Sequence, residues 1–200
     1  MPWRYLIHIG DLPLTVSAAA AVTVWMLIAR AWRMAFWWSL LFLLAIGIVA
    51  ATKIAFLIWG SLPPAYGFRA LSGHAAGVTA VAAFALFLSS QGYGARLSLA
   101  GVTSGLLLGG LMCVLLVACD EHSIAEAAGG WAVGALAALG AIGLGGAPPP
   151  ASASLGAIAG ASMFFVASVV VLRPLPIGYL MWRAAKLVAR HAGALVSAGF

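Results

Sequence analysis

The chain has 200 residues, of which 64% are hydrophobic and only 7% charged, and its mean hydropathy is +1.12. About a quarter of the residues in a soluble domain are charged, so this composition excludes a disordered chain, a nucleic-acid binder and a secreted disulfide scaffold. We expect the basic residues behind the net charge of +6 to interact with lipid headgroups and to set the membrane topology. Cys113 and Cys119 lie in one apolar run and indicate neither a zinc site nor a disulfide.

The charged residues divide the chain into long uncharged segments. A helix needs about 20 apolar residues to cross the hydrocarbon core of a membrane. We therefore predict an all-α, polytopic membrane bundle of six transmembrane helices, forming a single domain over 1–200. The predicted spans are 12–29, 34–52, 74–90, 97–118, 127–144 and 154–172.

Three further segments complete the predicted topology. Residues 1–10 are expected to be an interfacial lead-in. The stretch from Lys53 to Arg69 contains two prolines and is predicted to be a loop, which could be opened by one more helical turn. The tail, 173–200, carries three cations at roughly helical spacing (Arg183, Lys186 and Arg190) and is predicted to be an amphipathic helix at the interface.

The number of crossings places the polar residues of the chain at one face of the membrane. Lys53, Arg69 and His74 follow the second span, and the polar cluster at 120–126 follows the fourth, so an even number of crossings separates them. All four acidic residues fall on this face, whereas Arg30, Arg33 and Arg96 fall on the other. Ionisable residues at one end of a bundle are functional candidates, although a single loop histidine is more often simply solvated.

Ser72-Gly73-His74 stands where the predicted loop turns into the third span. A helix N-terminus offers unpaired N–H groups and the positive end of a dipole, which suits a phosphate. Gly73 allows the backbone to approach an anion closely. His74 would then be an acid within reach of a leaving oxygen. Three residues alone are a weak motif.

His122 and Glu126 are four residues apart and are predicted to share a helix face. Glu126 would accept a hydrogen bond from one imidazole nitrogen, leaving the other as a nucleophile or base. Two alternatives remain open: a metal pair completed by His74 or Asp120, and a capping carboxylate beside a solvated histidine.

Lys53 and Arg69 are the candidate phosphate-binding cations. The first would act as a point charge and the second as a bidentate clamp. Their alternatives are a snorkelling interfacial lysine and a solvated loop arginine. Together these residues predict a phosphoryl-transfer site in which His122 attacks phosphorus and His74 protonates the leaving group. We expect no cofactor and no metal.

Over roughly 50–145 the chain resembles the type 2 phosphatidic acid phosphatase superfamily, whose core is shared with vanadium haloperoxidases. Lys53 matches its first block, Ser72-Gly73-His74 its Pro-Ser-Gly-His block with Leu71 in place of proline, and His122 with Glu126 its His-x3-Asp block. The resemblance implies an integral-membrane lipid phosphatase that works through a phosphohistidine. The implied substrates are lipid phosphates such as polyprenyl pyrophosphate, phosphatidylglycerophosphate or lipid A.

The resemblance also has two departures. Gly60 and Leu116 stand where the family has phosphate-binding arginines, and losing such a contact commonly costs about 3 kcal/mol of transition-state stabilisation. These departures favour an alternative: a catalytically weak membrane subunit that binds a lipid phosphate or a partner. A small transporter is less favoured, because no charge sits in mid-span.

The resemblance implies a bacterial inner membrane with the site on the periplasmic face. The short basic link from Arg30 to Arg33 would then lie inside, as the positive-inside rule prefers. The basic tail would lie on the face of the site, which argues for the opposite orientation. Expected partners are the lipid phosphate and membrane lipids, with no nucleic acid.

Overall fold

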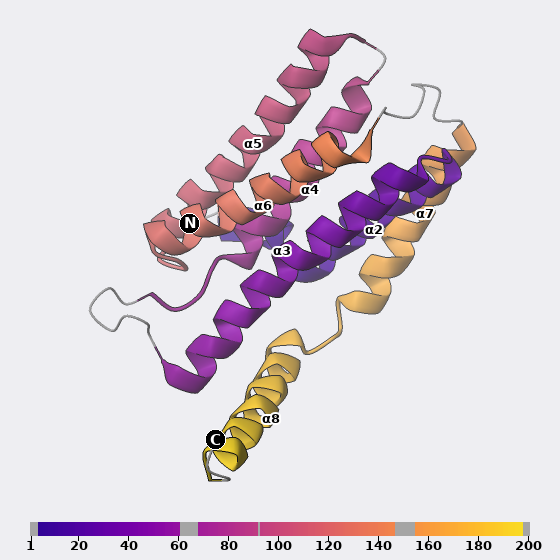
Figure 1. Cartoon of the computed structure of the whole chain (residues 1–200). Coiled ribbons are helices and arrows are strands. Elements are labelled where there is room, and N and C mark those ends of the chain that lie inside the picture. Colours follow the sequence, from indigo (N-terminus) through magenta and orange to yellow (C-terminus); the bar gives the residue numbers. More distant parts are fainter. Residues whose placement is uncertain (1–3, 61–67, 92, 147–154, 198–200) are drawn as a thin grey trace.

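A computed structural model of the chain describes residues 4–60, 68–91, 93–146 and 155–197, and all of the regular structure in these ranges is helical. Figure 1 shows the arrangement. The elements are α1 (Arg4–Ile7), the 3-10 turn η1 (His8–Gly10), α2 (Leu12–Ile28), α3 (Trp32–Trp59), α4 (Gly73–Ser90), α5 (Ala95–Ala118), α6 (Ile124–Gly145), α7 (Leu155–Leu172) and α8 (Ile177–Ser197). The Pro63-Pro64 part of the predicted loop and the break at Pro148–Pro150 lie outside the described residues.

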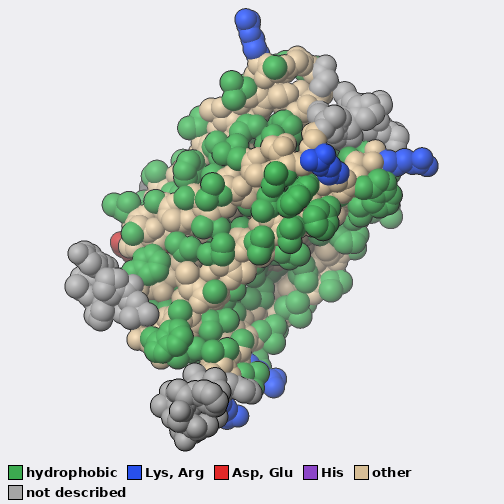
Figure 2. Space-filling model, viewed as in Figure 1, with side chains coloured by type: hydrophobic (Ala, Val, Ile, Leu, Met, Phe, Trp, Pro, Cys, Tyr) green, Lys and Arg blue, Asp and Glu red, His purple; other side chains and the backbone are tan. Residues whose placement is uncertain are grey.

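The outer surface of the bundle is apolar, as a membrane protein requires. Large hydrophobic side chains are exposed along the helices, among them Leu43 at 66%, Leu107 at 69% and Val170 at 68%. Figure 2 shows hydrophobic side chains covering the flank of the molecule, with Lys and Arg side chains near its two ends. Water cannot solvate such a surface favourably, whereas lipid tails can.

Among the described helices, α3, α4, α5 and α6 are each long and apolar enough to cross a membrane. α7 and α8 meet that standard only as a pair, bent by 64°, and α2 is apolar but shorter, with 17 residues. The structure therefore supports four membrane-spanning helices, or five if the bent pair crosses once.

The second helix extends beyond its predicted end. α3 continues to Trp59, so the prediction of a loop opened by one more helical turn is wrong for the residues between the end of that turn and 59. Residues Ile54–Trp59 are apolar apart from the backbone and contain no proline, so nothing interrupts the helix before Gly60, whose φ is +77°. Lys53 consequently lies inside the helix, nearly two turns before its end.

α4 is the central helix and packs against both α5 and α6. The close approach depends on glycine: a methyl group at Gly105 of α5 would overlap the backbone of Ala83, and one at Gly130 of α6 would overlap the carbonyl oxygen of Ser72. Small residues drive helix association in lipid by this kind of backbone contact. The Gly130 contact sets the start of α4 against the start of α6.

The remaining elements cover this three-helix core. α3 packs on α6, α2 packs on α7 and α3, and η1 folds back against α4. The side chain of Ile7 is buried with Ala75, Met112 and Leu116, so the lead-in is attached to the bundle. α8 packs against α3 near the end of the molecule that holds Lys53.

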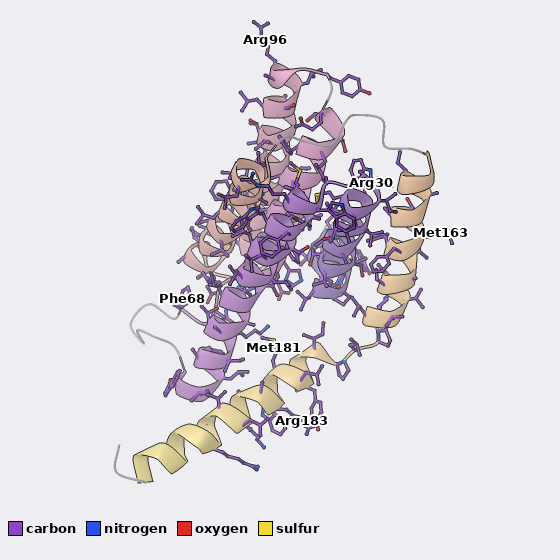
Figure 3. All side chains as sticks on the ribbon, turned by 45° about the vertical axis from the view of Figure 1, so that its right-hand side comes forward. Arg30, Phe68, Arg96, Met163, Met181 and Arg183 are labelled. Carbon is purple, nitrogen blue, oxygen red and sulfur yellow. The ribbon has the colours of Figure 1, made fainter. Side chains whose placement is uncertain are left out.

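The two ends of the bundle carry different residues, as the number of crossings predicts. Arg33 at the start of α3 donates from Nε to the carbonyl oxygen of Leu144 at the end of α6, 3.0 Å away, which joins these two helix ends. Figure 3 shows Arg30 and Arg96 toward one end of the molecule and Phe68, Met181 and Arg183 toward the other.

Candidate functional site

A cavity of about 400 Å³ lies at the end of the bundle that carries Phe68 and Met181. Parts of α2, α3, α4, α6 and α8, the turn η1 and the segments that precede α4 and α6 form its walls. Six of the seven predicted site residues line it: Lys53, Arg69, Gly73, His74, His122 and Glu126. Residues more than 70 positions apart in the sequence therefore converge on one cavity.

The predicted contact between His122 and Glu126 is present in the structure. His122 Nδ1 lies 3.0 Å from Glu126 Oε2, and the glutamate is fully buried. Because an ionised carboxylate can only accept hydrogen bonds, Nδ1 carries a proton in this contact, and in the neutral ring the lone pair is then on Nε2. The nitrogen that is free to meet a substrate is therefore Nε2.

The route to this contact differs from the prediction, because His122 does not lie on a helix. α6 begins at Ile124 and Ser123 is its N-cap. Ser123 Oγ accepts from the backbone N–H of Glu126, and the glutamate accepts from the N–H of Ser123, which forms a capping box. The glutamate side chain thus folds back over the first turn, which brings its second partner, His122, within reach.

Glu126 also joins two segments that are far apart in the sequence. Its Oε1 accepts a hydrogen bond of 2.6 Å from the backbone N–H of Arg69. Its carbonyl oxygen accepts another, of 3.0 Å, from the N–H of Ser72. The capping carboxylate, one of the two alternatives left open, is therefore present in the structure. The same carboxylate also bonds to His122 and to the segment before α4.

His74 lies in the first turn of α4 and has a carboxylate partner that the sequence did not reveal. Its Nε2 lies 3.0 Å from Asp11 Oδ1, and the other oxygen of Asp11 lies 3.2 Å from His8 Nδ1. The side chain of His74 is 33% exposed, that of Asp11 41% and that of His8 69%. This pair is half-solvated, in contrast to the buried Glu126.

Ser72, the seventh predicted site residue, is fully buried and caps α4, its Oγ accepting from the N–H of Ala75. Its hydroxyl oxygen accepts in this cap, and the residue is not among those that line the cavity. The N–H groups of Gly73 and His74, at the first two positions of α4, have no acceptor among the described residues. The start of α4 therefore presents two N–H groups where Gly73 and His74 line the cavity.

The two cations reach the cavity from opposite segments. Lys53 comes from α3 and Arg69 from the segment before α4, and within the described residues neither side chain forms an ion pair. The hydroxyl of Thr52 accepts from the N–H of Leu71, 3.1 Å away, which fastens this segment to α3 beside Lys53. Both cations are thus available to an anion in the cavity.

The structure also shows lining residues that the sequence analysis did not select. They include Gly10, Phe56, Glu121, Ile177 and Met181. Ile177 and Met181 are four apart on α8, a spacing that could have suggested one buried helix face but not what it covers. In the described part of the chain, no group of three or more His, Cys, Asp or Glu residues is arranged to hold a metal ion.

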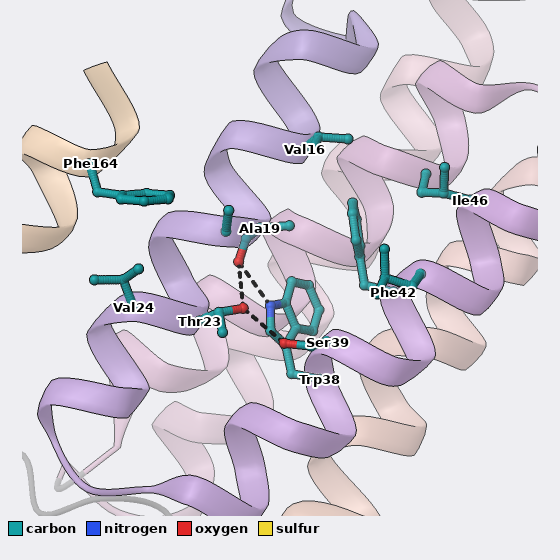
Figure 4. Close-up of a pocket in the computed structure, with 11 residues that line it drawn as sticks. Val16, Ala19, Thr23, Val24, Trp38, Ser39, Phe42, Ile46 and Phe164 are labelled. Atoms are coloured by element: carbon teal, nitrogen blue, oxygen red, sulfur yellow. Dashed lines mark hydrogen bonds between the residues drawn. The ribbon is translucent and has the colours of Figure 1, made fainter. Parts of the chain in front are cut away.

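A second, apolar pocket of about 320 Å³ lies between α2, α3 and α7. In Figure 4, Phe164 of α7 faces the residues of α2 and α3 across it. Its polar groups are already paired: Thr23 Oγ1 lies 3.1 Å from Ser39 Oγ, and Trp38 donates to the carbonyl oxygen of Ala19 at 3.1 Å. Ile46 lines both this pocket and the cavity of the histidines.

Comparison with known proteins gives one named relative and no family. The chain is 30% identical over 136 residues to a Klebsiella pneumoniae protein described as an uncharacterized 22.5 kDa protein in the cps region. The alignment covers 68% of this chain and 65% of the relative, so the chain spans just under two thirds of the relative's length. No family model matches the chain, and no solved structure matches it significantly.

Proposed function

We propose that the protein is an integral-membrane lipid phosphatase that works through a phosphohistidine on His122. The observation that carries the proposal is the shared cavity. It brings together two histidines, each bonded to a carboxylate, with two cations and the N-terminus of α4. These are the groups that in-line phosphoryl transfer needs: a nucleophile, an acid and positive charge around the phosphoryl oxygens.

The proposed reaction has two steps. In the first, the lone pair of His122 Nε2 forms a bond to phosphorus while the bond from phosphorus to the lipid oxygen breaks. That oxygen takes the electron pair and a proton from His74. In the second, water attacks phosphorus, His74 takes a proton from the water, and His122 leaves with its original lone pair. Lys53, Arg69 and the start of α4 stabilise the charge of the phosphoryl oxygens.

The apolar pocket supports a substrate with a long hydrocarbon chain. From Lys53 to Ser39, α3 rises by roughly 20 Å, at about 1.5 Å per residue. An amphiphile with its phosphate near Lys53 could run past Ile46, which lines both cavities, and lay its chain against Trp38 and Ser39. Burying a chain there is favourable, because the hydroxyls and the indole N–H that face it are already hydrogen-bonded.

The test is phosphate release by the purified protein in detergent from a panel of polyprenyl pyrophosphate, phosphatidylglycerophosphate and lipid A. His122→Ala should abolish release, whereas Thr103→Ala, a control at an exposed residue of α5 whose hydroxyl bonds only to its own helix, should retain it. Equal rates for wild type and His122→Ala would contradict the proposal.

A second candidate is a membrane subunit that binds lipid phosphate without hydrolysing it. The observation that favours it is Leu116, which stands where the resembled family has an arginine and is fully buried against Ile7 and Met112. No cation can act on a phosphate from that position. This candidate predicts saturable lipid-phosphate binding with no turnover across the panel, and clear turnover by the pure protein would exclude it.

We propose that all six predicted spans cross the membrane and that α8 lies at its surface. α2 and α7 pack side by side, as two neighbouring crossings would. At 17 residues, α2 is at the short end of the range that spans a bilayer. On α8, Lys186 lies 3.6 Å above the ring of Trp182, a pairing of aromatic and cationic side chains that suits the headgroup layer.

For sidedness, we propose the periplasmic face of a bacterial inner membrane, as the resemblance implies. The cations of α8 argue against this orientation under the positive-inside rule. Ile177 and Met181 line the cavity, so the basic tail lies at the end of the bundle that holds the site. In a Cys113→Ser/Cys119→Ser background, an impermeant maleimide should label Trp59→Cys in spheroplasts and not Tyr93→Cys. Both side chains are exposed, at 62% and 72%, and the reverse pattern would place the site in the cytoplasm.

A further inference from the structure

We infer that Asp11 is a positioning residue for His74: its carboxylate holds the imidazole in the Nε2–H form, so that Nδ1 is the nitrogen that exchanges protons in the cavity. Asp11 was not among the predicted site residues, and the inference as far as it concerns catalysis rests on the proposed phosphatase function. Asp11 Oδ1 lies 3.0 Å from His74 Nε2.

The backbone around Asp11 is shaped to bring this carboxylate onto the ring. η1 ends at Gly10, and a methyl group added there would lie 2.9 Å from His74 Cβ and 3.1 Å from His74 Cδ2. Only a residue without a side chain allows so close an approach. The Cδ2–Nε2 edge of the ring therefore faces η1 and Asp11, and Nδ1 lies on the opposite edge.

This arrangement is the counterpart of the one at His122. Glu126 binds Nδ1 of its histidine and leaves Nε2 free, which suits a nucleophile whose lone pair attacks phosphorus. Asp11 binds Nε2 of His74 and leaves Nδ1 free. An aspartate that stabilises the imidazolium and keeps one tautomer lets a single nitrogen, Nδ1, give a proton to the leaving oxygen and later take one from water.

The role predicts a dependence on the leaving group. Release of an aliphatic alcohol needs protonation of its oxygen, whereas 4-nitrophenolate leaves readily without it. With enzyme in excess, Asp11→Asn should slow the first release of octanol from octyl phosphate by about 10- to 100-fold, while release from 4-nitrophenyl phosphate should change by less than about threefold. The matched control is Asp120→Asn, the same change at an exposed residue whose φ of +58° asparagine tolerates; it should leave both rates unchanged.

A second measurement does not depend on turnover. The chain has four histidines, so ¹⁵N-histidine labelling in micelles gives few signals, and His74→Gln identifies the signal of His74. At about pH 9, well above the ordinary titration range of imidazole, His74 should show the Nε2–H tautomer in the wild type and in Asp120→Asn. In Asp11→Asn it should show a mixture of tautomers or the Nδ1–H form.

The two measurements separate the possible failures. If the wild type releases neither octanol nor 4-nitrophenol, the spectra alone decide whether Asp11 sets the tautomer of His74, and the lipid panel decides separately whether the phosphatase function stands. If the wild type is active and Asp11→Asn slows both substrates equally, or slows neither, the inference fails and the phosphatase function stands. An unchanged tautomer in Asp11→Asn overturns the inference in every case.

Discussion

The two histidine–carboxylate pairs of the cavity are built in opposite ways. In the His122 region (His122, Ser123 and Glu126), the carboxylate is fully buried and accepts two backbone N–H groups besides the imidazole. In the His74 region (His8, Gly10, Asp11 and His74), the carboxylate is 41% exposed and its side-chain partners are two imidazoles. Both histidines line the same cavity.

Glu126 and Asp11 are therefore expected to differ in how much they contribute to the stability of the fold. Glu126 connects α6 to the segment before α4 by hydrogen bonds, so removing its side chain should destabilise the fold as well as the site. Asp11 bonds to side chains that are partly solvated, and exposed ion pairs contribute only about 0–1 kcal/mol to stability. We therefore expect Asp11 to contribute little to stability and Glu126 to contribute much, which leaves the positioning of His74 as the proposed role of Asp11.

The largest expected effect on stability comes from a substitution in the His122 region. Glu126→Ala leaves the N–H groups of Arg69 and Ser123 without their acceptor, and hydrogen bonds to a charged group contribute about 1.5–3 kcal/mol each. We expect a loss of about 3 kcal/mol in the free energy of unfolding, after partial compensation by water, measured by thermal denaturation in one detergent. Asp11→Ala should lose less than about 1 kcal/mol. Equal losses in the free energy of unfolding would show that the two carboxylates contribute equally to stability and would contradict this comparison.

Sequence reasoning worked best where a feature depends on neighbouring residues. Charges that interrupt apolar segments located the described helices, and the spacing of His122 and Glu126 predicted their contact, although through a shared helix face rather than a capping box. The number of crossings also brought His74 and His122 to one end, because parity needs only the order of the spans.

Features that depend on packing could not be predicted. Asp11 and His74 are 63 residues apart, and no local pattern shows that η1 folds back onto α4. Ser72 was predicted to bind phosphate, and the sequence did not show that its hydroxyl oxygen would cap α4 or that the residue would lie behind the cavity wall. The length of α3 beyond Lys53 was missed because a single lysine in an apolar run was interpreted as the end of a span, whereas its long side chain can reach a cavity from within the helix.

Glycine substitutions provide the finer comparison between the two regions. A methyl group at Gly130 would overlap the carbonyl oxygen of Ser72, an atom fixed by the backbone of α4, whereas Gly110 of α5 has nothing within 4 Å. Gly130→Ala should therefore cost about 1–3 kcal/mol through overpacking. Gly110→Ala should be neutral or stabilise by up to about 1 kcal/mol, because alanine favours a helix over glycine.

Gly10→Ala should fall between these two variants, at about 1 kcal/mol. Its added methyl group meets His74 Cβ at 2.9 Å, and because Ile7 anchors the preceding turn in the core, we expect a small local shift of Gly10 and Asp11 to relieve the contact. The shift would separate Asp11 from His74, so Gly10→Ala should change the His74 tautomer as Asp11→Asn does, at a smaller loss of thermal stability than Gly130→Ala. If Gly10→Ala instead destabilised the protein as much as Gly130→Ala, η1 would be a structural part of the bundle, and the contrast between the two regions would disappear.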